Sequence, residues 1–294
     1  MSHEKIAIIG AGPAGMAAAA QLSRYGIVSV VFEKNEPGGI LPNARLVENY
    51  PGFPDGISGT ELSTLFRRQF EKSSHELKTE TVMKLDLDGT EFLIQTETET
   101  YHFDKVIIAS GTVPKKPGCC IDPNALACIC YDISRIRDLT GKTIAIAGSG
   151  DTAFDYALSL CMKNEVIILN RAEKTKCLDI LFKEAAGNPN IRYMENTDVS
   201  GIIKTQEGIK LQCRSGGTNI EIPADLIIFA IGREPCTEFI SSEVSSHINE
   251  LTGSNLLFFA GDVRNGIFRQ TAISTGNGIE AAMRICKGPG GDAD

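Results

Sequence analysis

The stretch Ile6-Ala-Ile-Ile-Gly10-Ala-Gly12-Pro-Ala-Gly15 decides the fold, because an apolar strand runs directly into a glycine-rich turn. This spacing predicts a strand, a tight turn and a helix whose N-terminus faces a phosphate group. Gly10 permits the turn, Gly12 lets the backbone approach a pyrophosphate, and Gly15 lets the helix pack closely on the sheet. The stretch therefore predicts a dinucleotide-binding domain.

The residues that follow complete this nucleotide site. The Ala-rich segment 14–25 is expected to be a helix, and residues 28–33 read as a buried strand. The strand ends at Glu33, eighteen residues after Gly15, where an acid is expected to bind a ribose hydroxyl. Strand, turn, helix and acid are thus all in place.

A second stretch of the same kind begins at Ile144 and reads Ile-Ala-Ile-Ala-Gly148-Ser-Gly150-Asp-Thr-Ala153. Again a helix (152–162) and an apolar strand (165–170) are expected after it. One such motif is a weak signal, but two in one chain indicate that two dinucleotides meet. A flavin joined to a nicotinamide nucleotide is the usual form of this arrangement.

The second motif lacks its acid, because its strand ends in Asn170. Arg171 follows, with Lys174 and Lys176 nearby, and cations at this place can pair with a 2′-phosphate. NADPH is therefore favoured over NADH. The alternative is that this site no longer binds a nicotinamide nucleotide.

The two halves of the chain repeat one plan, which predicts two Rossmann-like, three-layer α/β domains with parallel sheets. Each half also carries a three-stranded β-meander, within 82–103 and within 202–222. A last strand (255–262) and helix (271–286) have no glycine motif of their own, so they should return to the first domain. The expected domains are residues 1–112 with 240–294 and the inserted residues 113–239, each with one dinucleotide site.

Composition narrows the setting of the protein. The 294 residues are 42% hydrophobic and carry a formal charge of −8, which disfavours nucleic acid as a partner. No apolar run is long enough to span a membrane. Nine cysteines without a secretory leader fit a reducing, cytoplasmic location.

Two further motifs carry a family resemblance. One is the run Val47-Glu-Asn-Tyr-Pro-Gly-Phe-Pro-Asp-Gly-Ile-Ser-Gly59 with Pro37-Gly-Gly39 before it, and the other is Phe259-Ala-Gly-Asp262 followed by Phe268-Arg-Gln-Thr-Ala272. Both resemble the low-molecular-weight thioredoxin reductases. The resemblance implies FAD in the first domain, NADPH in the second, a homodimer and an α/β fold of two nucleotide-binding domains.

The same resemblance implies site residues. Gly39 and Asn49 would line the flavin, Asp262 would hold the ribityl chain, and Gln270 and Thr271 would face the pyrimidine side of the ring. The full set of FAD contacts is Gly10, Gly12, Pro13, Ala14, Gly15, Glu33, Lys34, Gly39, Ile40, Asn49, Val82, Ser110, Gly111, Gly261, Asp262, Arg269, Gln270 and Thr271. The NAD(P)H contacts are Gly148, Gly150, Asp151, Thr152, Arg171, Lys174, Ile231, Gly232 and Arg233.

The cysteines depart from the family pattern, because the chain has no Cys-x-x-Cys. Cys128 and Cys130 lie in the corresponding region, and a Cys-x-Cys disulfide closes a smaller, more strained ring. Three interpretations stay open: a displaced redox pair, part of a metal site with Cys119 and Cys120, or structural thiols. Residues 132–138 are expected to form a polar helical stretch, so the segment between Cys130 and Lys142 is longer than in thioredoxin reductases. This longer segment resembles that of the ferredoxin–NADP and flavodoxin–NADP reductases on the same scaffold, which have no redox cysteines.

The leading hypothesis is an FAD-dependent oxidoreductase that passes electrons from NAD(P)H to a small disulfide or a thioredoxin-like protein, with Cys128 and Cys130 as catalytic residues. The second is an electron transferase linked to ferredoxin or flavodoxin, without thiol chemistry. The third is a non-catalytic FAD-binding redox sensor.

Overall fold

The computed structural model describes residues 4–287, which divide into two compact units. The first unit contains Leu46–Val113 with the described residues up to Pro42 and from Glu234 onward. The second contains Pro114–Arg233 and the short segment Asn43–Arg45. The second unit is thus inserted into the first along the chain. Residues 1–3 and 288–294, which the sequence analysis assigned to the first domain, lie outside the described residues.

The chain re-enters the first unit at Glu234, whereas the sequence analysis placed this point at residue 240. Two backbone hydrogen bonds hold the re-entering segment: Cys236 N–H donates to the Gly111 carbonyl (3.0 Å), and Leu85 N–H donates to the Phe239 carbonyl (2.8 Å). One of these bonds is made to Leu85 in the meander and the other to Gly111 just after a buried strand. Both partners are distant in sequence, so the pattern of residue types does not reveal where the chain re-enters the first unit.

A five-stranded parallel sheet forms the centre of the first unit, in the order β19-β7-β1-β2-β3. Its strands are β1 (Ile6–Ile9), β2 (Ser29–Phe32), β3 (His75–Lys78), β7 (Lys105–Ile108) and β19 (Leu257–Phe259). The middle strands are apolar on both faces, as expected for parallel strands that are covered on both sides. The last strand, β19, pairs with β7 and completes this sheet.

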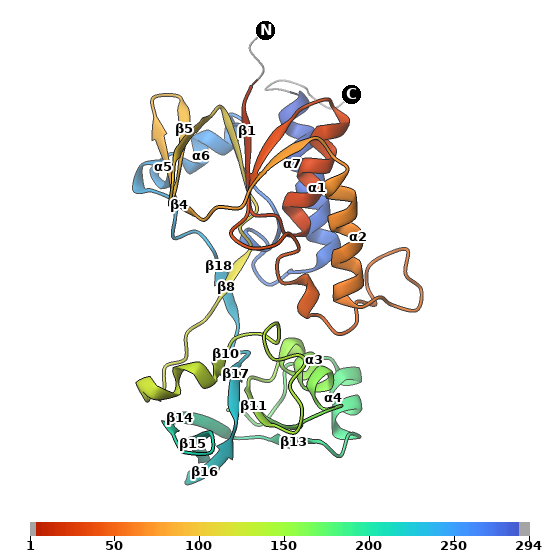
Figure 1. Ribbon diagram of the computed structural model, residues 1–294, viewed down its shortest axis with the longest axis vertical. Coiled ribbons are helices and arrows are strands. Elements are labelled where there is room, and N and C mark those ends of the chain that lie inside the picture. The colour runs from red at the N-terminus through yellow and green to blue at the C-terminus, as the bar shows by residue number, and fades with distance from the viewer. Residues whose placement is uncertain (1–3, 288–294) are drawn as a thin grey trace. The chain divides into compact units, whose positions relative to one another are not determined.

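Helices cover one face of this sheet and the meander covers the other (Figure 1). On the helical face, α1 (Pro13–Arg24), α2 (Gly59–Glu71) and α7 (Thr271–Lys287) enclose one apolar cluster. On the other face lie β4 (Val82–Asp88), β5 (Glu91–Thr96) and β6 (Thr100–Phe103), with Phe32, Phe92 and Phe103 in their core. Two short helices, α5 (Ser242–Ser246) and α6 (Ile248–Gly253), lead back to β19.

The second unit repeats this design. Its parallel sheet has the order β10-β17-β11-β12-β13. The strands are β10 (Ile129–Cys130), β11 (Thr143–Ala147), β12 (Glu165–Leu169), β13 (Ile191–Met194) and β17 (Leu226–Phe229). The helices α3 (Asp151–Leu160) and α4 (Asp179–Ala186) pack on one face around Phe154.

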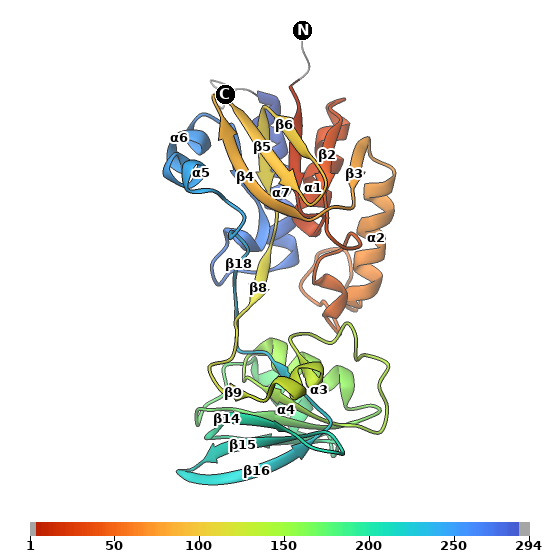
Figure 2. The same cartoon turned by 60° about the vertical axis from the view of Figure 1, so that its left-hand side comes forward.

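The meander of the second unit covers the opposite face of its sheet. It consists of β14 (Thr197–Lys204), β15 (Ile209–Ser215) and β16 (Thr218–Ala224), and the short strand β9 (Cys120–Ile121) joins its edge beside β14 (Figure 2). The pairings β14–β15 and β15–β16 are antiparallel. The predicted fold class, two α/β nucleotide-binding domains each with a meander, is confirmed.

The remaining elements are short. They are the 3₁₀ turns η1 (Leu41–Asn43), η2 (Pro123–Cys128) and η3 (Gly261–Val263), and the paired strands β8 (Thr112–Pro114) and β18 (Arg233–Pro235). Across residues 4–287, no helix is both long enough and apolar enough to cross a bilayer.

The helical stretch expected at residues 132–138 is wrong, because the structure has consecutive turns there. The Asp132 carboxylate accepts hydrogen bonds from the Ser134 N–H (2.9 Å) and hydroxyl (2.6 Å), which favours a turn over a helix. Ile133 and Ile136 are buried against the helical face of the sheet, so the segment is also less polar than its sequence suggested.

Candidate functional site

The predicted FAD residues follow four strands of the first unit where those strands end. The glycine turn follows β1, Glu33 follows β2, Ser110 and Gly111 follow β7, and Gly261 follows β19. Carboxyl ends of parallel strands share one edge of a sheet, and strand order reverses between β1 and β7. This is the topological switch point at which open α/β sheets bind their ligands.

The turn after β1 has the shape that a pyrophosphate needs. A Cβ atom added to Gly15 would lie 1.9 Å from the Gly10 carbonyl oxygen, so only glycine allows α1 to sit this close to the turn. Gly39 faces Gly12, and a Cβ on Gly39 would lie 3.2 Å from the Gly12 Cα. No side chain caps the N-terminus of α1. These residues therefore form a bare backbone cradle at a helix N-terminus, which fits a dinucleotide phosphate.

Glu33 does more in the structure than the sequence predicted. Its Oε2 accepts a hydrogen bond from the Ala11 N–H (2.8 Å) and its Oε1 accepts one from the Asn35 N–H (3.0 Å). The carboxylate thus fixes the backbone at Ala11, in the middle of the glycine turn, through a contact within the chain. A carboxylate has about four lone-pair positions, so Glu33 keeps the capacity to accept from a ribose hydroxyl as well.

Several residues that the resemblance assigned to the flavin lie together around the start of α7. Asn49 Nδ2 donates to Gln270 Oε1 (2.9 Å), which joins two residues expected to contact the flavin. The Asp262 Oδ1 accepts a hydrogen bond from the Ser274 hydroxyl (2.9 Å) on α7. Thr271 is the first residue of α7, so its helix dipole would favour negative charge near it.

Further predicted FAD residues are exposed, partly buried or in contact with other parts of the first unit. Lys34 and Ile40 are exposed, and Val82 begins β4, where it packs against the meander core. The Ser110 hydroxyl donates to the Cys236 carbonyl (2.7 Å), so this side chain fastens the re-entering segment. Arg269 is partly buried immediately before Gln270.

In the second unit, a cavity of about 850 Å³ opens at the second glycine turn. Predicted residues that line it are Gly148, Gly150, Thr152, Arg171, Ile231, Gly232 and Arg233. Two predicted residues do not. The Asp151 carboxylate instead accepts a hydrogen bond from the Leu178 N–H (2.9 Å), and Lys174 is exposed outside the lining.

The cavity is strongly cationic. Its charged lining residues are Lys115, Lys116, Arg171, Lys176 and Arg233 on the positive side, against Asp198 alone. No side chain caps the N-terminus of α3, which adds its positive dipole end. Such a cavity attracts an anionic ligand, and a dinucleotide phosphate fits both the charge and the bare turn.

Sequence reasoning missed two of these cations, Lys115 and Lys116. The sequence did contain a signal for them. Two adjacent cations follow Pro114, shortly after Gly111 at the end of a buried strand, which is where the chain enters the second unit. The Lys115 N–H donates to the Gly232 carbonyl (3.0 Å), so this segment is held along the cavity.

Cys128 and Cys130 lie at the edge of the second unit's parallel sheet. Cys128 ends η2 and packs against both apolar clusters, while Cys130 lies in β10 and packs against the helical one. Burial raises the pKa of the Cys130 thiol, and the nearby Asp132 carboxylate raises it further. All nine cysteines are free thiols, of which Cys120 is exposed.

The structure gives no support to a metal site built from these cysteines. Within residues 4–287, no three His, Cys, Asp or Glu side chains are arranged to hold an ion. Cys119 instead lines the cationic cavity of the second unit, and burial raises the pKa of its thiol.

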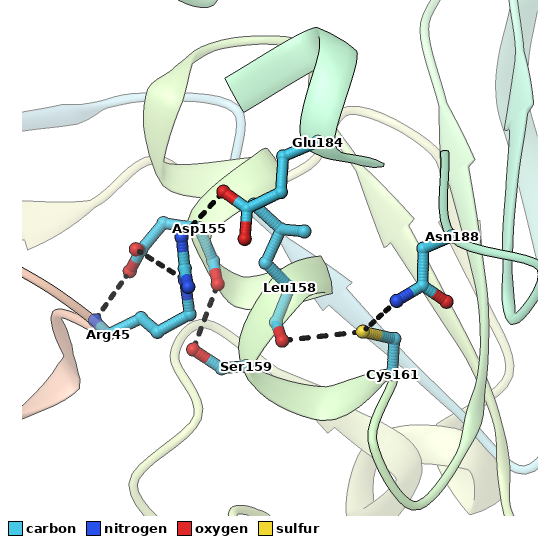
Figure 3. A network of polar contacts seen from close by, with 7 residues as sticks. All are labelled: Arg45, Asp155, Leu158, Ser159, Cys161, Glu184 and Asn188. Atoms are coloured by element: carbon cyan, nitrogen blue, oxygen red, sulfur yellow. Dashed lines mark hydrogen bonds and ion pairs between the residues drawn. The ribbon is translucent and has the colours of Figure 1, made fainter. Parts of the chain in front are cut away.

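A polar network in the second unit involves the segment Asn43–Arg45 and the helices α3 and α4 (Figure 3). The Arg45 N–H donates to Asp155 Oδ2 (2.9 Å), and its guanidinium pairs with Glu184 (2.9 Å). Burial raises the pKa of the Asp155 carboxyl, although the Arg45 N–H and charge oppose this shift. Arg45 thus supplies the partner that a half-buried carboxylate requires.

The same view shows why Cys161 is structural. Its thiol donates to the Leu158 carbonyl (3.3 Å) and accepts from Asn188 Nδ2 (3.2 Å) (Figure 3). The thiol is buried at the end of α3, and burial raises its pKa. A buried, hydrogen-bonded thiol of this kind is unreactive.

Residues 4–278 match the family model described as pyridine nucleotide-disulphide oxidoreductase. The chain belongs to this family. It is 31% identical to thioredoxin reductase 1 of Saccharomyces cerevisiae, over 96% of this chain and 97% of the relative. It is 32% identical to thioredoxin reductase of Pneumocystis carinii, over 96% of this chain and 94% of that protein.

Solved structures agree with this family assignment. The thioredoxin reductase of Lactococcus lactis is similar with a TM-score of 0.86 and 26% identity, over 97% of this chain and 98% of that one. The thioredoxin reductase of T. acidophilum has a TM-score of 0.82 and 27% identity, over 96% and 97% of the two chains. This family member is a flavin-dependent oxidoreductase of the thioredoxin-reductase type.

Proposed function

We propose that the protein takes a hydride from NADPH, passes the electrons through FAD and reduces a disulfide of a small redox protein, with thioredoxin as the first candidate. The cationic cavity at the second glycine turn carries this proposal, because it gives the nicotinamide nucleotide a site of suitable charge and volume. Anaerobic titration of the purified flavoprotein with NADPH and with NADH tests it. Rapid bleaching by NADPH is expected, and no bleaching by either nucleotide would contradict the proposal.

In this proposal the first unit holds the FAD. Gly12 and Gly39 would receive the pyrophosphate on bare backbone, Glu33 would accept from the ribose, and the N-terminus of α7 would stabilise negative charge at Thr271. The flavin supplies the step between two-electron hydride transfer and the acceptor. The protein contributes position and electrostatics.

NADPH rather than NADH follows from two cations that line the cavity beside the end of β12, Arg171 and Lys176. A charge-assisted contact with the 2′-phosphate contributes about 1.5–3 kcal/mol. Arg171→Ala should therefore weaken NADPH binding by about 10- to 100-fold and leave NADH binding unchanged. Lys174→Ala is the matched control, because this lysine of the same loop does not line the cavity. Equal weakening of both nucleotides in Arg171→Ala would contradict the assignment.

Cys128 and Cys130 are the proposed thiols for a disulfide acceptor. In this scheme the two thiols would give two electrons and two protons to the disulfide of the partner and become a disulfide themselves. The flavin, when bound, would supply the two electrons that restore the thiols. Cys130→Ser should abolish turnover with thioredoxin but leave reduction of an artificial quinone intact. Unchanged thioredoxin turnover in this variant would remove the pair from the mechanism.

A second candidate is transfer of single electrons to or from ferredoxin or flavodoxin, without thiols. The observation that favours it is the half-buried position of Cys130, whose raised pKa makes thiolate chemistry slower. Thiol labelling at pH 7.5 separates the two. Labelling of Cys130 at a rate close to that of the exposed Cys120 supports the pair, and strong protection supports the second candidate.

We also propose a homodimer in a reducing compartment such as the cytoplasm. Ile273, Ile279 and Met283 leave an apolar stripe exposed along α7, each with 40% of its surface accessible. Glu280 and Arg284 on the same helix already pair with each other (2.7 Å), so the apolar stripe, rather than these charges, would be the contact between two copies. Met283→Glu should convert the dimer to a monomer in light scattering, and a monomeric wild-type protein would contradict the proposal.

A further inference from the structure

Asn170 takes the position at the end of β12 where NAD-binding domains carry an acid. The residue is buried, with 2% of its surface exposed. Its Nδ2 donates to the Tyr193 hydroxyl (2.8 Å) and to the Lys174 carbonyl (3.2 Å), and its Oδ1 accepts from the Ala172 N–H (3.0 Å). Two of these hydrogen bonds hold the loop that follows Asn170, and the third fixes the amide against Tyr193 of β13.

The far end of the same loop is fixed by a second side chain. The Thr175 hydroxyl donates to the Ser149 carbonyl (2.8 Å) and accepts from the Cys177 N–H (3.2 Å). The Lys176 N–H donates to the same Ser149 carbonyl (2.8 Å). Ser149 lies between the two glycines of the second turn, so the loop is tied directly to the nucleotide turn.

These two anchors decide which charges of the loop reach the cavity. Arg171, Ala172 and Lys176 line it, whereas Glu173 and Lys174 do not. The loop thus presents two cations to the cavity and keeps its one carboxylate outside. An acid in place of Asn170 would attract ribose hydroxyls and repel a 2′-phosphate, but the amide is neutral and its oxygen is already occupied.

We propose that Asn170 and Thr175 are positioning residues that hold residues 171–176 as a preformed seat for the 2′-phosphate of NADPH. This inference rests on the proposed use of a nicotinamide nucleotide at the second turn. Because the loop is ordered by the protein's own groups, little ordering remains to be done when the nucleotide binds. Discrimination between NADPH and NADH then depends on the two uncharged side chains that place Arg171 and Lys176, as well as on these cations themselves.

Isothermal titration with adenosine 2′,5′-bisphosphate and with 5′-AMP tests the inference, because the two probes differ only in the 2′-phosphate. Wild-type protein should bind the bisphosphate at least 10-fold more tightly than 5′-AMP. Asn170→Asp should reduce this ratio at least 10-fold, mainly by weakening the bisphosphate. Asn219→Asp is the matched control, since it adds the same charge to an exposed asparagine of the same unit away from the cavity.

Thr175→Val provides an independent test at the other anchor and adds no charge. It should reduce the ratio about threefold, again through the bisphosphate. Equal weakening of both probes in both variants would show a structural role only and overturn the inference. The inference would also be overturned if both variants kept the same affinity ratio between the two probes as the wild-type protein. A wild-type ratio near one would instead overturn the proposed use of NADPH, and with it the seat.

Discussion

The turn after β1 and the turn after β11 are built on the same backbone hydrogen bonds. Gly10 N–H donates to the carbonyl of Phe32, and Gly148 N–H donates to that of Leu169, at 2.8 and 3.0 Å. In each turn, the carbonyl between the first two glycines accepts from the loop after the second strand: Ala11 from Gly38, and Ser149 from Lys176.

The loops after β2 and β12 differ in the residues that they place beside the turn. Gly38 leads into Gly39, which faces Gly12 and keeps the first turn bare. Lys176 brings a cation to the second cavity. The first turn also holds a carboxylate, Glu33, where the second holds the neutral Asn170. One backbone plan therefore serves two nucleotides, and the loop after the second strand sets the choice.

The third position of each motif offers the largest test of this comparison. Gly15→Ala should cost about 3 kcal/mol and release the flavin, because the added methyl group would meet the Gly10 carbonyl and push α1 away. The second turn already has an alanine there, and Ala153→Gly should cost only about 1 kcal/mol. Thermal unfolding and flavin absorbance after gel filtration measure both. A yellow Gly15→Ala protein with wild-type stability would contradict the close contact.

The carboxylate of the first turn gives a smaller effect. Glu33→Ala leaves the Ala11 and Asn35 N–H groups without their acceptor and should cost about 2 kcal/mol. Because these bonds lie within the chain, the loss should appear in flavin-free protein too. Glu33→Gln, which keeps one acceptor oxygen, should lose about half as much. A loss confined to the FAD-bound protein would mean that Glu33 acts on the ribose alone.

The smallest effect concerns two aspartates that start equivalent strands. Asp104 accepts from the Lys5 N–H (2.7 Å), and Asp225 accepts from the Thr143 N–H (2.8 Å) and pairs with Lys142 (2.9 Å). Burial opposes ionisation of Asp225, but Thr143 and Lys142 outweigh it and hold its pKa below the usual 3.8.

Asp225→Asn should therefore cost about 1 kcal/mol near neutral pH. A lowered folded-state pKa contributes stability above the unfolded value and loses it as the pH falls through the folded value. The difference between wild type and variant should accordingly shrink below pH 3.8, as measured by urea unfolding at several pH values. Asp104→Asn provides the matched variant in the first unit. A difference that grows in acid would show that the ionised form is not the stabilising one.

Much of this architecture was predictable because its signals are local. The apolar strands and the glycine turns each lie within a few residues of sequence. The start of α2 is equally local, because Ser58 and Glu61 have capping-box spacing and the Ser58 hydroxyl accepts from the Glu61 N–H (3.2 Å). The segment 132–138 failed because an aspartate-centred turn competes with the helix that the residue types suggested.

The site was less predictable, since it depends on contacts between distant segments. The sequence named both Lys174 and Lys176 as cations near Arg171 and could not tell which of them lines the cavity. The Lys176 N–H donates to the Ser149 carbonyl, and Lys176 lines the cavity whereas Lys174 does not. Lys115 and Lys116 reach the cavity because the segment after β8 is hydrogen-bonded to Gly232. The pattern of residue types in the sequence predicts neither of these two placements.

The position of α7 has a consequence for synthesis of the chain. A Cβ on Gly278 would lie 2.0 Å from the Ala14 carbonyl oxygen, so the last helix rests directly on the first. The first sheet also lacks β19 until nearly the whole chain exists, whereas residues 114–233 form a contiguous unit. At a translation rate of about 5–20 residues per second, the emerging N-terminal segment waits roughly 10 to 50 seconds for its closing helix. We therefore expect the inserted unit to be able to fold during that interval, before the apolar faces of the first unit are covered.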